Sequence, residues 1–285
     1  MTNPSWGDFG THDESAYPEL WDGVVGAWCP SLGPTGLRLH DHSRRSNWGT
    51  LTNMDAATDW VVSGGQYALD FDGSNDYVTG IGSISSFAFI PNPFIFTLAI
   101  WFNLNNLTTR CSLIGNTNTG AERGFLLIHE FGAGLGTNAI RMLVTHGTVG
   151  ETRDLRSADS VVVSGWNFAA IVGMGSAAAS KIYVNGVGVS TTVAQDWALT
   201  AGDATRSLSL GNDTRSAVVE NILWTPGRID DTKIWNRALT ANEIQQLYLL
   251  GRGGMYQRRR RTLRRVGVEQ GAAGARRRRI LTGMV

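Results

Sequence analysis

Short segments with the two-residue period of β-strands recur along the chain, and turn-forming residues separate them. Tyr67–Asp72 alternates apolar and polar side chains, and Phe94–Phe102 is the most apolar segment. Asn185-Gly186 lies between two such segments and is the strongest hairpin signal. The pattern predicts an all-β, antiparallel two-sheet β-sandwich or jelly roll with Phe94–Phe102 at its centre. Further predicted strands are Val24–Trp28, Tyr77–Val78, Cys111–Gly115, Gly124–Phe131, Ala139–His146, Trp166–Met174, Lys181–Val184, Ser207–Gly211 and Val218–Trp224.

The stretch from Gly227 to Leu250 predicts a strand followed directly by a helix. The first half alternates side chains between two faces. Thr240 and Glu243 then have the spacing of a capping box. The residues after them show the apolar spacing of an amphipathic helix: Ile244, Leu247 and Tyr248. Gly251 is a typical helix-ending residue, so we predict one short C-terminal helix and the end of the folded domain at Gly251.

Charge divides the chain into unequal parts. The net charge is +1, but residues 1–251 hold 14 Lys and Arg against 23 Asp and Glu. Residues 252–285 hold 11 Arg and one Glu, which is typical of a tail with an acidic partner of its own. Residues 1–20 lack periodicity. We therefore predict an N-terminal arm at 1–20, a domain at 21–251 and an Arg-rich attachment tail at 252–285, so that both terminal arms are extended.

The sequence disfavours several classes of protein. Cys29 and Cys111 are too few and too far apart for a disulfide framework, and both lie in apolar runs, so we expect buried free thiols. The polar, acidic start of the chain does not resemble a signal peptide. No apolar run is long enough to span a membrane. We expect synthesis in a cytoplasm, no membrane partner, and release by lysis or within a particle.

A series of motifs follows in order along the chain. They are VVGAW (24–28), NWGTLTN (47–53), LDFDGSNDYV (69–78), FTLAIWF (96–102), Trp166, KIYVNG (181–186), GRIDD (227–231), WNRALT (235–240) and Glu243-Ile244. Over about residues 21–250, this series resembles a laminin-G-like domain of the concanavalin A-like lectin/glucanase superfamily, of the kind found in phage structural proteins. The resemblance implies a two-sheet jelly roll with adjacent first and last strands and a terminal helix against one edge. It also implies a non-catalytic module that binds sugars or proteins, often with one structural Ca²⁺.

Carboxylates at two places are the candidate calcium ligands. Ca²⁺ prefers six to eight oxygen ligands from carboxylates, carbonyls and water. Asp72 ends a predicted strand beside a glycine turn, and the family resemblance adds Asp230 or Asp231 in the last strand. The alternative is that Asp72 caps its turn and Asp231 forms a salt bridge. The pair of histidines at 40 and 42 predicts a solvated turn more than a metal site.

Four tryptophans near predicted loops are the candidates for stacking on the apolar face of a sugar ring: Trp48, Trp60, Trp197 and Trp224. Four others lie in strand patterns and are predicted to belong to the core: Trp28, Trp101, Trp166 and Trp235. For each of the first four, an anchor for its own loop is the alternative interpretation.

The carboxylates do not have the spacing of a glycosidase. Retaining enzymes need two carboxyl groups close together across the scissile bond, and the glucanases of this superfamily usually carry them on one strand, as Glu-x-Asp-x-x-Glu or Glu-x-Asp-x-Glu. Neither spacing occurs, and three glutamates are isolated: Glu130, Glu151 and Glu220. The phosphate-loop, nucleophile-elbow and zinc patterns are also missing. We therefore predict that the protein is not an enzyme.

The tail combines arginine clusters with apolar residues, a pattern that suggests docking on a partner more than a purely solvated segment. The arginines expected to bind the partner are Arg258, Arg259, Arg260, Arg261, Arg264, Arg265, Arg276, Arg277, Arg278 and Arg279. We predict a structural or decoration protein of a virus particle, in particular a tailed phage, that displays a lectin-like domain and contacts capsid or tail proteins as a homo-oligomer. The alternatives are a free carbohydrate-binding module or adhesin, and a structural protein whose tail contacts nucleic acid.

Overall fold

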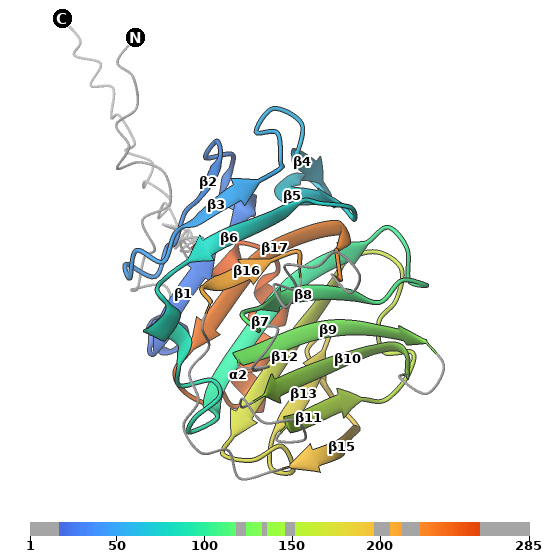
Figure 1. Ribbon diagram of the computed structural model, residues 1–285. Helices are drawn as coiled ribbons and strands as arrows, with labels where there is room; N and C mark the ends of the chain where they lie inside the picture. The colour runs from blue at the N-terminus through green and yellow to red at the C-terminus, as the bar shows by residue number, and fades with distance from the viewer. Residues whose placement is uncertain are drawn as a thin grey trace, which may run out of the picture.

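The computed structural model describes residues 17–117, 124–132, 136–145, 152–196, 206–212 and 223–256. Two antiparallel sheets lie face to face, as the sequence predicts, and one helix exceeds two turns among these residues (Figure 1). Sheet A contains β14 (Val187–Val189), β13 (Lys181–Val184), β12 (Asn167–Met174), β7 (Ile95–Leu104), β17 (Pro226–Trp235), β5 (Gln66–Asp72) and β4 (Trp60–Ser63) in spatial order, with β1 (Val24–Trp28) also on β17.

Sheet B forms the other layer and lies in front in Figure 1. Its strands in spatial order are β15 (Thr191–Asp196), β11 (Thr152–Ser157), β10 (Gly136–Thr145), β9 (Gly124–Gly132), β8 (Cys111–Gly115), β16 (Leu208–Leu210), β6 (Tyr77–Ile81), β3 (Gly49–Thr52) and β2 (Arg38–Leu39). The helical elements are α1 (Pro18–Trp21), η1 (Pro30–Leu32), η2 (Ile84–Phe87), α2 (Ala241–Leu250) and η4 (Gly254–Tyr256).

The main core lies between the sheets, and alternation along the strands fills it. Strand β7 pairs with β12 on one side and β17 on the other, in the middle of sheet A. Alternate side chains of β7 enter the main core: Phe96, Leu98, Ile100, Phe102 and Leu104. The opposite side chains, Ala99 and Trp101, join a second buried cluster on the outer face of sheet A. The predicted central position of Phe94–Phe102 is therefore confirmed.

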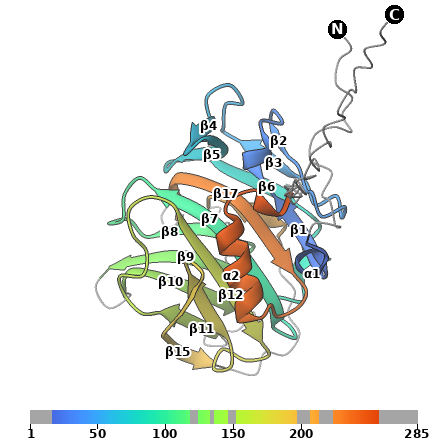
Figure 2. The same cartoon turned by 180° about the vertical axis from the view of Figure 1, so that it is seen from behind.

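Helix α2 covers the outer face of sheet A (Figure 2). Its capping box is present, because Thr240 Oγ1 accepts the N–H of Glu243 and Glu243 Oε2 accepts the N–H of Thr240, at 3.3 and 2.8 Å. The Tyr248 ring stacks on Trp101, with ring centroids 5.7 Å apart. Since Trp101 belongs to the central strand β7, the helix covers a face of the sheet and not the edge that the family resemblance implied.

Strand β17 connects two parts of sheet A. Its first half pairs with β5 and its second half with β1, while β7 lies along the other side. First and last strands are thus adjacent, as expected. Between the two halves, the register shifts at Asp231, whose φ of 40° lies in the left-handed region that is unfavourable for a residue with a Cβ. At this irregularity, Asp230 and Asp231 contact groups outside the hydrogen-bond ladder of the sheet, namely Ser31 and Gly253.

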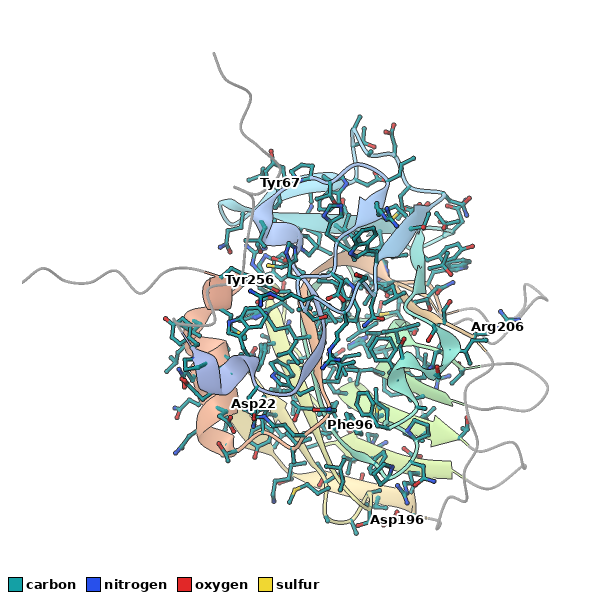
Figure 3. The ribbon with its side chains drawn as sticks, turned by 90° about the vertical axis from the view of Figure 1, so that its left-hand side faces the viewer. Asp22, Tyr67, Phe96, Asp196, Arg206 and Tyr256 are labelled. Atoms are coloured by element: carbon teal, nitrogen blue, oxygen red, sulfur yellow. The ribbon has the colours of Figure 1, made fainter. Side chains whose placement is uncertain are left out.

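The folded domain extends further than predicted at both ends. Arg252 is 8% exposed, and η4 is buried. The ring of Tyr256 meets that of Trp21 edge-on, with centroids 5.3 Å apart, and Figure 3 shows Tyr256 on the side of the helices. The boundary predicted at Gly251 is therefore five residues too early, since the chain packs through Tyr256. Helix α1, which includes Leu20, is part of the domain and not of the arm.

The structure also bears on the predicted buried thiols and on the expectation that no segment spans a membrane. Cys29 and Cys111 are buried free thiols, as predicted, and burial raises the pKa of Cys111 to about 12. In the part of the chain that the structure describes, neither helix has the length and apolar character needed to cross a membrane.

Candidate functional site

The predicted calcium ligands do not converge. Asp72 ends β5 opposite Pro226, whereas Asp230 lies four residues further along β17, about 13 Å away at the rise of a β-strand. Asp72 Oδ1 accepts the N–H groups of Ser74 and Asn75 at 2.7 and 3.1 Å, so it caps its own turn. Sharing of one ion by Asp72 with Asp230 or Asp231 is therefore wrong for this arrangement. Among the described residues, no group of three or more metal-binding side chains occurs; calcium binding as such stays a prediction.

Asp230 and Asp231 bind the C-terminal segment of the domain instead. Asp230 is fully buried and accepts hydrogen bonds from the N–H and hydroxyl of Ser31 and from Arg252 Nη1, the last at 3.3 Å. Asp231 pairs with Lys233 and accepts the N–H of Gly253 at 3.0 Å. Burial, followed by the neighbouring charge of Asp231, raises the pKa of Asp230 to about 7. The ion pair of Asp231 with Lys233 is the salt bridge that the sequence analysis gave as the alternative to calcium binding. The role of these contacts is structural.

Arg252 is the hub of this segment. Its Nη2 donates to the carbonyl of Ser63, its own carbonyl accepts from Gln66, and its guanidinium lies 3.9 Å from the ring centre of Trp166. We call residues 251–256, which these contacts hold on the outer face of sheet A, the C-terminal clasp. The clasp and α1 together occupy that face beside α2 (Figure 2).

The four candidate sugar-stacking tryptophans have different environments. Trp60 is 7% exposed and belongs to the main core, and its Nε1 donates to the carbonyl of Gly36, so its assignment to a sugar site is wrong. Trp48 is 38% exposed, but the Arg38 guanidinium lies 3.8 Å from its ring centre and His40 stacks beside it. Trp197 and the arginines of the tail lie outside the described residues. Trp224 is partly exposed, and the ring beside it belongs to another aromatic residue, Tyr77.

Trp224 lies next to Tyr77 on the outer face of sheet B. The two half-buried rings are tilted, with centroids 5.8 Å apart. Tyr77 faces outward because its neighbour Val78 is fully buried in the core. The chain on either side of Trp224 is fixed to β8, since Leu223 O accepts the N–H of Ser112 and Thr225 Oγ1 donates to its carbonyl. Sequence reasoning found Trp224 but missed Tyr77, which comes from a distant strand.

A buried amide, that of Asn212, lies on the segment next to Trp224, because the carbonyl of Gly211 accepts the N–H of Thr225 at 2.9 Å. Asn212 is 5% exposed, and its main-chain carbonyl accepts the hydroxyl of Ser112 at 3.0 Å. Its side-chain Oδ1 has no hydrogen-bond partner among the described residues. An unsatisfied buried acceptor costs free energy, but this oxygen is closed to solvent, so a ligand hydroxyl does not reach it without a rearrangement. Aromatic faces beside amide acceptors are the groups that recognise sugars.

Charged side chains cross the same face of sheet B. Glu130 of β9 is fully buried and binds two arginines: Arg110 Nε and Nη2 at 2.8 and 3.0 Å, and Arg141 Nη1 at 3.1 Å. Arg141 also donates from Nε and Nη2 to both oxygens of Asp154, at 2.8 and 2.5 Å. We call Arg110, Glu130, Arg141 and Asp154 the arginine row. The sequence signal was a lone glutamate in an apolar strand, which reveals burial but not its partners.

The description of the family fits this geometry. A laminin-G-type family model for the concanavalin A-like lectin/glucanases superfamily matches residues 72–245, more than half of the chain. The chain belongs to this superfamily. A search of curated proteins finds no match.

Solved structures of the same fold include members with known ligands. One is the receptor-binding domain of the botulinum neurotoxin C/D mosaic serotype, with 15% identity, a TM-score of 0.55, and coverage of 80% of this chain and 51% of that chain. Another comes from botulinum neurotoxin type C, whose cell entry is described as dependent on two ganglioside molecules; it has 14% identity, a TM-score of 0.56, and coverage of 81% and 52%. The chain spans about half the length of these neurotoxin chains.

A third structure is domain 4 of AbnA, a GH43 extracellular arabinanase from Geobacillus stearothermophilus, in complex with arabinotriose. Its identity is 17%, its TM-score is 0.54, and the match covers 78% of this chain and 97% of that domain. At these identities, the likeness concerns the fold.

The superfamily includes both lectins and glucanases, and the described carboxylates of sheet B suit the first more than the second. A glycosidase needs one carboxyl group free to transfer a proton and a second one close to the sugar. In this superfamily member both oxygens of Glu130 are occupied by guanidinium N–H groups. Asp154 is likewise held by Arg141. Neither is free to act as an acid or a nucleophile.

Proposed function

We propose that the protein is a non-catalytic, glycan-binding structural protein of a virus particle, in particular of a tailed phage. Its lectin-like domain binds a cell-surface sugar with the outer face of sheet B, and its Arg-rich tail attaches it to other structural proteins. The observation that carries the proposal is the half-buried pair of Tyr77 and Trp224, with the buried amide of Asn212 on the neighbouring segment. The ganglioside and arabinotriose named for proteins of the same fold support a glycan as ligand.

The glycan site follows from the chemistry of these three side chains. A sugar ring has an apolar face that packs against an aromatic ring and hydroxyls that bond to amide oxygens. The residues on either side of Trp224 are bound to β8 by two hydrogen bonds, so the backbone that carries the ring is held in place before a ligand arrives. A preformed platform loses little conformational entropy on binding.

The attachment role is supported by charge and by where the described chain ends. The domain has an excess of acidic residues, whereas ten of the eleven arginines after Gly251 follow the clasp. The clasp ends at Tyr256 against Trp21 of α1, so the first and last described elements meet on the outer face of sheet A. The proposed sugar site lies on the opposite layer. A tail that starts at Tyr256 would fix the protein from one side and leave the other side toward the glycan.

The sugar site is tested by comparing the unaltered protein with a Trp224→Ala variant on a broad glycan array. We expect at least one glycan to bind, and its affinity to fall roughly 10- to 100-fold in the variant. Trp48→Ala is the matched control, because Arg38 and His40 already lie against that ring and its loss should leave binding unchanged. Silence across the array, or dependence on Trp48 instead of Trp224, would overturn the proposed site. Release of reducing ends from a bound glycan would overturn the non-catalytic role.

Attachment is tested by deleting residues 257–285 and measuring incorporation into the native particle. The cut follows Tyr256, so that the clasp contacts of Arg252 remain. We expect incorporation to be lost while the domain stays folded. Unchanged incorporation would refute attachment by the tail. Salt-sensitive binding of the full-length protein to DNA that disappears with the deletion would favour the nucleic-acid role.

A further inference from the structure

A small open pocket lies between α1, the start of β1 and the turn at residues 41–47. Its volume is about 360 Å³, which is within the range of pockets that hold small ligands. Three apolar side chains line it, namely Pro18, Trp21 and Val24, together with three polar ones, namely Asp22, Ser43 and Arg45. Trp21 and Val24 are buried and form its base, whereas Asp22, labelled in Figure 3, and Arg45 are exposed at its rim.

The turn at residues 41–47 is fixed by a buried carboxylate. Asp41 is 9% exposed, and its oxygens accept the N–H of Ala27 at 2.9 Å and the N–H of Asn47 at 2.9 Å. They also accept the N–H and the hydroxyl of Ser43, at 2.8 and 2.7 Å. The Asn47 side chain donates in turn to the carbonyl of Val25 at 2.8 Å. The wall of the pocket is therefore held in place before a ligand arrives, which lowers the entropy cost of binding.

The backbone on both sides of Arg45 is in an unfavourable conformation. Arg44 has a φ of 66° and Ser46 a φ of 58°, both in the left-handed region that residues with a Cβ rarely adopt. Non-glycine residues in this region are concentrated at functional sites, because the surrounding structure must enforce the conformation. Between these two positions, Arg45 directs its side chain to the pocket.

Arg45 and Asp22 bring opposite charges to the same pocket without neutralising each other. Among the described residues, Arg45 forms no ion pair. The side chain of Asp22 is 80% exposed, and its ion pair with Arg237 Nε, at 3.8 Å, is too long for a hydrogen bond. The pocket thus offers a guanidinium that can donate to an anion and, separately, a carboxylate that can accept from hydroxyl groups.

We propose that this pocket binds a small polyhydroxylated molecule with one anionic group, such as a sugar acid or a sugar phosphate. The anionic group pairs with Arg45, because a guanidinium donates two parallel hydrogen bonds to a carboxylate or a phosphate. Hydroxyl groups donate to Asp22, and the ring carbons lie over the apolar base. The pocket shares no residue with the proposed glycan site at Trp224, and the inference does not depend on that site.

The test titrates the full-length protein with glucuronate, with the phosphate ester of glucose and with glucose itself, followed by ligand-observed NMR. At least one of the two acids should bind roughly 10- to 100-fold more tightly than glucose, as expected for a charge-assisted hydrogen bond. Tighter binding of glucuronate would identify a carboxylate as the recognised group, and tighter binding of the ester would identify a phosphate. The preference for the acid should weaken as salt increases.

Arg45→Gln should remove the preference without changing the stability of the domain, because this side chain is exposed. Arg45→Lys should retain part of the preference. Arg38→Gln is the matched control, since it removes the same charge from an arginine that lies against Trp48 and does not line the pocket.

Three results would overturn the inference. The first is equal affinity for glucose and both acids, or no binding of either acid at millimolar concentrations. The second is an unchanged preference in Arg45→Gln, or an equal loss in Arg38→Gln, which would show a general effect of charge. The third is loss of acid binding in Trp224→Ala, which would place the acid at the glycan site. Absence of glycan binding at Trp224 with acid binding that depends on Arg45 would refute only the proposed glycan site.

Discussion

Replacing Arg252 by Ala should destabilise the domain by an amount that depends strongly on pH. The side chain makes three contacts: an ion pair with Asp230, a hydrogen bond to the carbonyl of Ser63 and a cation–π contact with Trp166. The last two are lost at any pH, and together they are worth about 1–2 kcal/mol. The ion pair adds to this only when Asp230 is charged. Removing one partner of a buried pair then costs about 3–5 kcal/mol.

The raised pKa of Asp230 sets the pH window. Burial, with the charge of Asp231, brings that pKa to about 7, above the ordinary value of 3.8. The folded state thus retains a proton that the unfolded chain releases, and the stability from this carboxyl is present below about pH 4 and lost as the pH rises toward 7. At about pH 5 the variant therefore buries a neutral carboxyl, and we expect a loss of about 1–2 kcal/mol. At about pH 8 the carboxyl of the variant has lost the cation that lowers its pKa, so it either stays charged without a partner or takes up a proton, and we expect a loss of about 2–4 kcal/mol.

Urea unfolding, followed by tryptophan fluorescence at both pH values, measures the two free energies. Arg258→Ala is the control, because it removes the same charge from a residue beyond the clasp and should change the free energy of unfolding by less than about 0.5 kcal/mol. In an Asp230→Asn background, the cost of Arg252→Ala should no longer depend on pH. A cost below about 1 kcal/mol at both pH values would show that Arg252 belongs to the tail and not to the domain. A cost that is equal at both pH values would refute the role of Asp230.

Three further outcomes are expected. Trp60→Ala should lower the free energy of unfolding by about 3–5 kcal/mol because it empties a core position, whereas the exposed Trp48→Ala should cost less than about 1 kcal/mol, both measured by urea unfolding. Gly227→Ala should lower the free energy of unfolding by more than about 2 kcal/mol, because its φ is 144° and the added Cβ would lie 2.4 Å from the carbonyl oxygen of Asn103. Gly36→Ala also has a positive φ, but its Cβ would meet no atom, so the same assay should give a loss of about 1 kcal/mol. Cys29 and Cys111 should not react with a disulfide-exchange reagent until urea unfolds the protein, since burial raises both thiol pKa values; reaction in the native state would contradict their burial.

Local sequence patterns were sufficient to predict the elements whose formation depends little on residues far away in the sequence. The alternation in Tyr67–Asp72 reflects one buried face, which is a property of the strand itself, and β5 occupies Gln66–Asp72. The capping box of Thr240 and Glu243 involves residues three apart and forms as predicted. Strands β11 and β15 were missed because their sequences, TRDLRS and TTVAQD, are mostly polar. Their pairing depends on the neighbouring strand β10 and on ion pairs such as that of Arg141 with Asp154.

The candidate site was harder to predict because its residues come together through register. Trp60 and Trp224 both follow loops in the sequence, but Trp60 enters the core from β4 and Trp224 faces outward beside Tyr77. The predicted sharing of one ion by Asp72 with Asp230 or Asp231 was wrong for a similar reason, whereas calcium binding itself stays a prediction. Family resemblance placed Asp72 and Asp230 on neighbouring strands, which is correct, but it did not specify the offset of four residues between them.

Arg252 shows the limit of composition as a guide. It is the first of eleven arginines after Gly251, and a run of like charge predicts a solvated segment. Its burial is decided by Asp230, Ser63 and Trp166, which lie up to 189 residues away in the sequence. The left-handed backbone of Asp231 also contributes, since it directs a carboxylate to the N–H of Gly253. No local pattern distinguishes such an arginine from the ten that follow.

The two outer faces of the sandwich differ in how far helices and chain ends cover them. The two helices α1 and α2 and the C-terminal clasp pack on the outer face of sheet A. Their apolar side chains form a second buried cluster with that face. That cover removes most of the outer face of sheet A from contact with a ligand. Sheet B has no helix over its outer face among the described residues, and its outward side chains at Tyr77 and Arg141 are partly exposed, whereas Ser112 and Ile128 between them are buried. The proposed ligand site on sheet B and the proposed attachment point on sheet A would share one structural cause, which is the adjacency of the first and last strands in sheet A.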